Sequence, residues 1–165
     1  MNAPVTPQTL HVEELLQAAR ERAPGLKDFG NDNYQQALEV LTRALNTEAK
    51  LSATGIAMIR ERLVGQLVNR LLMEDYLQRF PEIAQIEIED PLVIVGLPRT
   101  GTTMLQRTLA VDPRFYSAAW WETRYPAPLN GDSPKDASKR IEMAKAEVAQ
   151  TIEAIPQILS IHPMN

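Results

Sequence analysis

The sequence predicts an α/β fold in which a helical N-terminal region precedes the first strand of a parallel sheet. Apolar residues recur at the spacing of one helical face through the first ninety positions, which indicates amphipathic helices. An unbroken apolar run, Leu92 to Val95, then lies between Pro91 and Gly96, and such runs are typical of strands buried on both faces of a parallel sheet. With 165 residues, 44% of them hydrophobic, the chain has enough apolar material for one buried core.

Three amphipathic helices are expected in the N-terminal region. They are predicted at about residues 10–22, 34–45 and 52–80. Pro24-Gly25 ends the first helix, and Ser52 is the predicted N-cap of the third. Apolar stripes of this kind usually serve packing, so we interpret residues 1–90 as a helical cap region without chemistry of its own.

The second region, residues 91–165, is predicted to start the sheet domain without completing it. A helix is expected at about 102–111, a second strand at Phe115–Ala119, and a longer helix at about 134–154, capped by Ser133. Because a parallel sheet needs several covered strands, this inventory is too small. We expect an N-terminal fragment of a longer domain, marginally stable by itself or self-associating as a homo-oligomer.

Composition and charge exclude several classes of function. The chain has no cysteine and only two histidines, which rules out disulfides, thiolate metal sites and a local histidine metal motif. A formal charge of −4 argues against nucleic-acid partners and anionic membranes. No apolar run reaches the length of a membrane-spanning helix, and no secretory signal is recognisable at the N-terminus, so we expect a cytoplasmic protein.

A glycine-containing loop between the predicted strand and the following helix is the strongest functional signal. The segment Gly96-Leu-Pro-Arg-Thr-Gly101-Thr-Thr103 has the setting in which backbone N–H groups and a helix N-terminus hold a phosphate or sulfate. Its glycine spacing matches the nucleotide-binding P-loop, so the sequence predicts a P-loop fold. Thr102, however, occupies the position where that motif requires lysine. Arg99 restores a positive charge, and its planar guanidinium suits a tetrahedral oxyanion.

The loop resembles the 5′-phosphosulfate loop of sulfotransferases that use 3′-phosphoadenosine-5′-phosphosulfate (PAPS). The family pattern P-[KR]-[ST]-G-T-T is matched in full. The matching residues, which the resemblance implies bind PAPS, are Pro98, Arg99, Thr100, Gly101, Thr102 and Thr103. The arginine variant is similar to the tyrosylprotein and bacterial branches of the family, and the helical N-terminal region also resembles bacterial members.

A second segment carries the same resemblance. Trp121-Glu122-Thr123-Arg124 resembles the Glu-Thr-Arg segment in which tyrosylprotein sulfotransferases place their catalytic base, although extra residues precede it here. The resemblance therefore implies that Glu122 is the general base and that Arg99 is the catalytic cation. The family's second PAPS element, an arginine and a serine that bind the 3′-phosphate, has no counterpart before Asn165.

The function expected from this resemblance is transfer of a sulfuryl group from PAPS to a hydroxyl or amine of a small-molecule acceptor. Such a transfer depends on alignment and positive charge, which Arg99 would supply without a metal. We expect the 165-residue chain by itself to be inactive. Two alternatives stay open: a P-loop kinase or nucleoside triphosphatase, and a non-catalytic helical interaction module with a vestigial anion loop.

Overall fold

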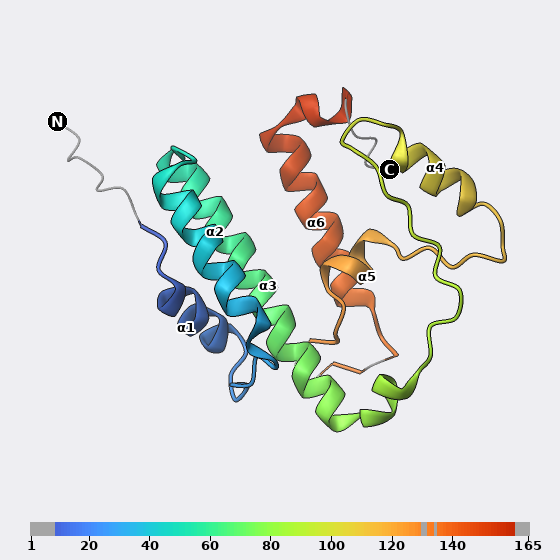
Figure 1. Ribbon diagram of the computed structural model, residues 1–165, viewed down its shortest axis with the longest axis horizontal. Helices are drawn as coiled ribbons and strands as arrows, with labels where there is room; N and C mark the ends of the chain where they lie inside the picture. Colours follow the sequence, from blue (N-terminus) through green and yellow to red (C-terminus); the bar gives the residue numbers. More distant parts are fainter. Residues whose placement is uncertain (1–8, 130–131, 134, 161–165) are drawn as a thin grey trace. The chain divides into compact units, whose positions relative to one another are not determined.

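The chain divides into two compact units. The computed structural model describes residues 9–129, 132–133 and 135–160. The first unit comprises Met1–Pro81 with Pro126–Ala137, and the second comprises Glu82–Tyr125 with Ser138–Asn165. Figure 1 labels the helices of both units.

The first unit contains the three expected helices, and each prediction is confirmed to within a few residues. They are α1 (Val12–Arg22), α2 (Gln35–Thr47), which the short 3-10 helix η1 (Asp32–Tyr34) precedes, and α3 (Ala53–Arg79). Ser52 is the N-cap of α3, since its Oγ accepts the Gly55 N–H at 3.1 Å. Local sequence signals therefore suffice to place this part of the chain.

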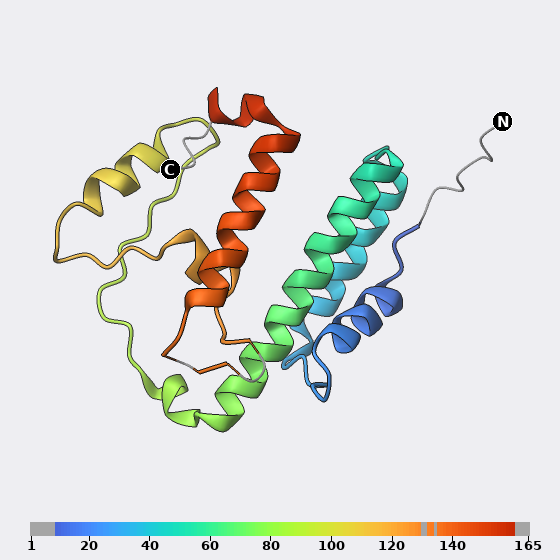
Figure 2. The ribbon, with the colours of Figure 1, turned by 180° about the vertical axis from the view of Figure 1, so that it is seen from behind.

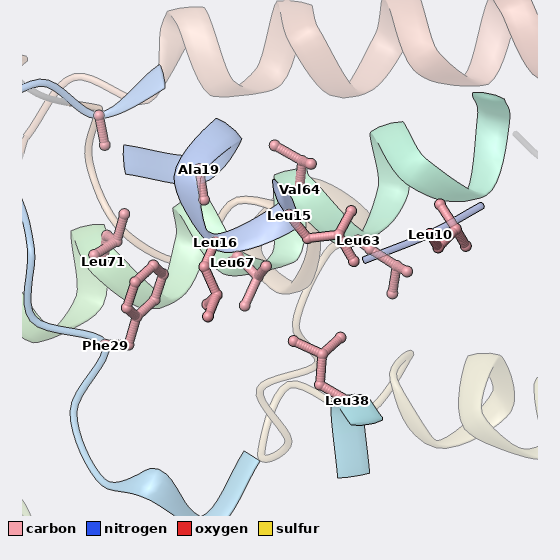
Figure 3. Packing of buried hydrophobic residues seen from close by; sticks show 11 residues of the cluster. Leu10, Leu15, Leu16, Ala19, Phe29, Leu38, Leu63, Val64, Leu67 and Leu71 are labelled. Atoms are coloured by element: carbon pink, nitrogen blue, oxygen red, sulfur yellow. The ribbon is translucent and has the colours of Figure 1, made fainter. Parts of the chain in front are cut away.

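The core of the first unit lies between α1 and α3. Figure 3 shows Leu15 and Leu16 of α1 beside side chains of α3, with Leu38 of α2 at the edge. The eleven buried residues of this cluster are Leu10, Leu15, Leu16, Ala19, Ala23, Phe29, Leu38, Leu63, Val64, Leu67 and Leu71. Each fully buried leucine contributes about 1.5–3 kcal/mol, so the cluster is the main source of this unit's stability.

The side chains of Asn46 and Arg70 hydrogen-bond to the segments that precede α1 and α2. The Asn46 side chain accepts the Leu10 N–H at 2.9 Å and donates to the Leu10 carbonyl at 2.8 Å. Arg70 of α3 donates to the carbonyl of Asn31 at 2.7 Å and lies 4.4 Å from the centroid of the Tyr34 ring. These contacts satisfy backbone groups that the helices themselves do not use.

The second unit contains α4 (Thr102–Leu109), α5 (Trp120–Arg124) and α6 (Ser138–Ala154). Figure 2 shows α5 and α6 from behind, and the two helices are in contact. The 3-10 helices η2 (Pro81–Gln85) and η3 (Pro156–Ser160) flank these elements. Helix α4 is confirmed, whereas α6 begins later than the capping signal at Ser133 predicts; Pro134, the expected first residue, lies outside the described residues.

The predicted α/β P-loop fold with a parallel sheet is wrong for this structure, because the described residues contain no strand. The run from Leu92 to Val95 has no regular secondary structure, and Val93 and Val95 are 75% and 88% exposed. An apolar run indicates a strand only where a neighbouring strand pairs with its N–H and C=O groups. The described part of the chain supplies no such neighbour.

The second predicted strand, Phe115–Ala119, is likewise wrong. This segment has no regular secondary structure and is exposed along its length. In the described part of the second unit only Arg140 and Ala144 are buried, both on α6. Without burial, the apolar residues of these segments gain nothing from an extended conformation.

Candidate active site

The loop before α4 has a backbone conformation that few residues adopt. Gly101 has φ 86° and Arg99 has φ 68°, both in the left-handed region. Glycine adopts this region without penalty, whereas an arginine there is strained and persists only when its surroundings favour it. The two residues turn the chain sharply, and α4 begins directly afterwards at Thr102.

The loop also closes on itself around Gly96. A Cβ atom at Gly96 would lie 2.8 Å from Thr102 Cγ2 and 2.9 Å from Thr100 Oγ1, so a side chain there would require these threonine side chains to move. Thr100 donates its hydroxyl hydrogen to the Leu97 carbonyl at 2.6 Å, which fixes the other side of the turn. The sequence motif therefore forms a small closed loop, with glycine where the side chains of Thr100 and Thr102 approach most closely.

This arrangement is chemically suited to a tetrahedral anion. The first N–H groups of a helix have no partner within the helix, and together with the helix dipole they attract negative charge. The loop brings the six predicted binding residues, Pro98 to Thr103, to the start of α4, where most of them are exposed. Threonine hydroxyls and the Arg99 guanidinium are the donors that a phosphosulfate would need, so the residues present fit this group.

Glu122 lies on α5 and accepts two hydrogen bonds. The Tyr116 hydroxyl donates to Glu122 Oε1, and the Ala119 N–H donates to Glu122 Oε2 at 2.6 Å. The second bond is half of a capping box, because Ala119, the N-cap residue, has no side-chain acceptor. The Tyr116 hydrogen bond, the Ala119 N–H and the charge of Arg140 together lower the pKa of Glu122 below its ordinary value.

Helix α6 fixes the end of α5 through an ion pair. Arg124 Nε donates to both carboxylate oxygens of Glu147, at 3.0 and 2.8 Å, and the Tyr125 hydroxyl donates to Glu147 Oε2 at 3.1 Å. The Arg124 and Glu147 side chains are only 14% and 27% exposed. The Arg124 side chain is therefore held by the ion pair with Glu147 of α6. Breaking this half-buried pair would remove the contact that attaches the C-terminal end of α5 to α6.

Arg140 is the second contact from α6. It is 8% exposed, its Nη1 donates to the Tyr125 carbonyl at 3.1 Å, and its guanidinium lies 5.0 Å from the centroid of the Trp121 ring. Trp121 is half-buried beneath it, whereas Trp120 is 49% exposed. A cation in the first turn of a helix opposes the helix dipole, so the tertiary contacts, and not α6 itself, account for this arginine.

The loop and Glu122 belong to the same unit but lie on different elements. Thr100 of the loop hydrogen-bonds to Leu97, whereas Glu122 accepts from Tyr116 and Ala119. A hydrogen bond from Gln106 of α4 to Ser117 connects the loop's helix to the segment that carries Tyr116. The structure thus groups the predicted anion-binding residues with one another, and it groups Glu122 with side chains from α6.

Sequence reasoning missed Tyr116 and Arg140. Arg140 lies among alternating charges on α6, a pattern that usually marks a solvated helix face. The one signal that distinguishes it is its place in the first turn, where a basic residue is unfavourable. Tyr116 precedes Glu122 by six residues in a segment without periodicity, and nothing in the sequence indicates their contact.

Two further classes of site are not found among the described residues. They contain no group of three or more histidine, cysteine, aspartate or glutamate side chains placed to hold a metal ion. No helix in the described part of the chain combines the length and apolar content needed to cross a membrane.

Comparison with known families gives a match for the second region, residues 91–165. Residues 91–165 match the model of the sulfotransferase family, a stretch that contains both the loop and Glu122. This portion of the chain is similar to the sulfotransferase family, which agrees with the resemblance to sulfotransferases at family level and supports a sulfotransferase function. No curated protein and no solved structure gave a match.

Proposed function

We propose that the protein carrying this sequence transfers a sulfuryl group from PAPS to a hydroxyl or amine of a small-molecule acceptor. The observation that carries the proposal is the family match over residues 91–165, which includes an intact Pro-Arg-Thr-Gly-Thr-Thr loop at the start of a helix. The similarity to the bacterial and tyrosylprotein branches belongs to the proposal as well. It rests on Arg99 and on the Glu122 segment.

The loop residues have separate roles in this proposal. Thr100 to Thr103 bind the 5′-phosphate through backbone N–H groups and hydroxyls at the N-terminus of α4. Arg99 stabilises the negative charge that develops on the equatorial and leaving oxygens, as a preorganised cation does in phosphoryl transfer. Arg99 holds a left-handed backbone φ of 68° within the loop, a conformation that a non-glycine residue rarely adopts.

Glu122 is the proposed general base. Its carboxylate takes the proton of the acceptor hydroxyl or amine as the acceptor atom attacks sulfur. PAPS, when bound, supplies the sulfuryl group, and the bond between sulfur and the bridging phosphate oxygen breaks to release adenosine 3′,5′-bisphosphate. Glu122 Oε1 accepts from Tyr116 and Oε2 from Ala119, and a carboxylate oxygen has a second lone pair that can take the incoming proton.

Titration calorimetry with PAPS in the presence of EDTA tests the proposal. We expect metal-free binding that Arg99→Ala weakens by about 10-fold or more, because a charge-assisted contact to an anion is lost. Arg114→Ala is the matched control, since Arg114 is exposed and pairs with Asp112 in the same unit. The control should bind PAPS as the wild type does.

The other readings of the loop give different results in the same experiment. A kinase or nucleoside triphosphatase would bind ATP in the presence of Mg²⁺. In that case Arg99→Ala would not change the affinity measured for PAPS. A non-catalytic interaction module would bind neither nucleotide. Either result would overturn the proposed function.

A further inference from the structure

We propose that Tyr116 and Arg140 are positioning residues for Glu122: Tyr116 orients the carboxylate through its hydroxyl, and Arg140 fixes α5 and places a positive charge beside it. This inference rests on the proposed function, because it assigns Glu122 the role of base. It goes further by naming two side chains outside both sequence motifs. We call Tyr116, Ala119, Glu122 and Arg140 the Glu122 cluster.

Three donors or charges from three parts of the chain converge on one carboxylate. Tyr116 comes from the segment after α4, Ala119 is the N-cap of α5, and Arg140 comes from α6. With one donor on each oxygen, the Glu122 carboxylate has a defined rotation about its terminal bond. A solvated glutamate at a loop position would lack this constraint, so the cluster distinguishes Glu122 from an ordinary surface acid.

The burial of Arg140 needs a tertiary explanation. A buried arginine, 8% exposed, requires compensating partners, and the Tyr125 carbonyl and the Trp121 ring are two of them. Trp121 and Tyr125 flank Glu122 on either side in the sequence. Arg140 therefore contacts the chain on both sides of Glu122, at Trp121 within α5 and at Tyr125, the residue that follows α5.

The remaining charged groups around α5 do not replace Arg140. Arg124 is directed to Glu147 on α6, where the two charges largely cancel. A phenol is protonated at neutral pH, and the hydrogen bond to Glu122 raises the pKa of Tyr116 further, so Tyr116 remains a donor.

The cluster has a consequence for the reaction. A carboxylate that is stabilised in its charged form remains able to accept a proton at lower pH than an ordinary glutamate. The acid limb of kcat/KM reports the pKa of the base in the free enzyme. Loss of Tyr116 or Arg140 should therefore move the acid limb of kcat/KM to higher pH. A variant that is only less well folded would have lower kcat/KM at every pH, with the acid limb at the same pH as in the wild type.

Carbon-13 NMR titration of the Glu122 carboxyl tests the inference without requiring activity. The signal is assigned with Glu122→Gln and followed in the wild type, Tyr116→Phe and Arg140→Met. We expect the Glu122 pKa to lie below that of an ordinary glutamate in the wild type and to rise in both variants, more in Tyr116→Phe, which removes the larger cause of the shift. Arg140→Lys, which keeps the charge, should recover part of the lowering.

Lys145→Met is the matched control. It also removes a positive charge from α6, but Lys145 is 70% exposed and pairs with Glu142. The Glu122 pKa should not change in this variant. If Tyr116→Phe and Arg140→Met both titrate like the wild type, the inference is overturned. Tyr116→Phe keeps the aromatic ring at an exposed position, so it remains decisive even if Arg140→Met fails to fold.

Kinetic measurements separate this inference from the proposed function. In the protein carrying this sequence, Arg140→Met should lower kcat by up to about 10²-fold, the scale of misplacing a catalytic group by about 1 Å, and should shift the acid limb of kcat/KM upward. Absence of sulfuryl transfer by the wild type would overturn the proposed function, while the NMR titration would still decide whether Tyr116 and Arg140 control Glu122.

Discussion

Single residues in this protein take their properties from short-range geometry. Glu122 is a carboxylate in the first turn of a five-residue helix, where it caps the helix through the Ala119 N–H and accepts the Tyr116 hydroxyl. Both contacts favour its charged form and therefore lower its pKa. A residue with a capping role and a proposed catalytic role must be tested with a substitution that preserves the first role.

Glu122→Gln is that substitution, because an amide oxygen can still accept the Ala119 N–H. We expect PAPS affinity to stay nearly unchanged and turnover to fall by about 10²- to 10⁴-fold, the contribution of a general base. The loss should be smaller for acidic phenols than for aliphatic alcohols, since phenols lose their proton more readily. The measurement is kcat for a series of acceptors of graded pKa in the protein carrying this sequence. An equal, small effect on every acceptor would show that Glu122 is a solvated cap and no base.

At the scale of elements, the loop before α4 depends on glycine at one left-handed position. Gly101 has φ 86°, and a Cβ placed there would meet no atom within 4 Å. A substitution at Gly101 is therefore strained only through its backbone, whereas one at Gly96 would press against the side chains of Thr100 and Thr102. This separation of backbone strain from steric collision makes Gly101 the cleaner position for a test.

Gly101→Ala should reduce the free energy of unfolding by about 1–2 kcal/mol, the cost of placing an L residue in the left-handed region, and should weaken PAPS binding. Gly25→Ala is a matched control, because Gly25 has φ 88° and equally open surroundings, but follows α1 in the other unit. Urea denaturation and titration calorimetry on both variants make the comparison. Equal PAPS affinity in Gly101→Ala and Gly25→Ala would argue against a role for the loop conformation in binding.

At the scale of the whole molecule, burial is distributed unequally. The first unit has the eleven-residue cluster of Figure 3, whereas the described residues of the second unit bury only Arg140 and Ala144. Apolar side chains between residues 86 and 97 are more than half exposed at Ile86, Ile88, Val93 and Val95. Stability against local opening should follow this distribution, since it derives mainly from buried apolar area.

Hydrogen exchange measured by NMR or mass spectrometry tests this expectation. The amides of α3 between Leu63 and Leu71 should be the most protected in the chain, because the cluster surrounds them. The amides of residues 92–95 should exchange at close to the rate of an unstructured peptide, since the described residues provide no paired strand. Protection of residues 92–95 that grows with protein concentration would indicate self-association, and protection independent of concentration would contradict the structure described above.

The amino-acid sequence by itself determined the helices of the first unit, the position of α4 and the similarity of residues 91–165 to the sulfotransferase family. These features depend on periodicity, capping and motif residues that are neighbours in the chain. Only the tertiary structure decided that residues 92–95 form no strand and that Glu122 is surrounded by Tyr116 and Arg140. A strand needs a partner strand, and the charge state of a carboxylate depends on which side chains contact it in three dimensions, so periodicity and motifs alone cannot specify either one.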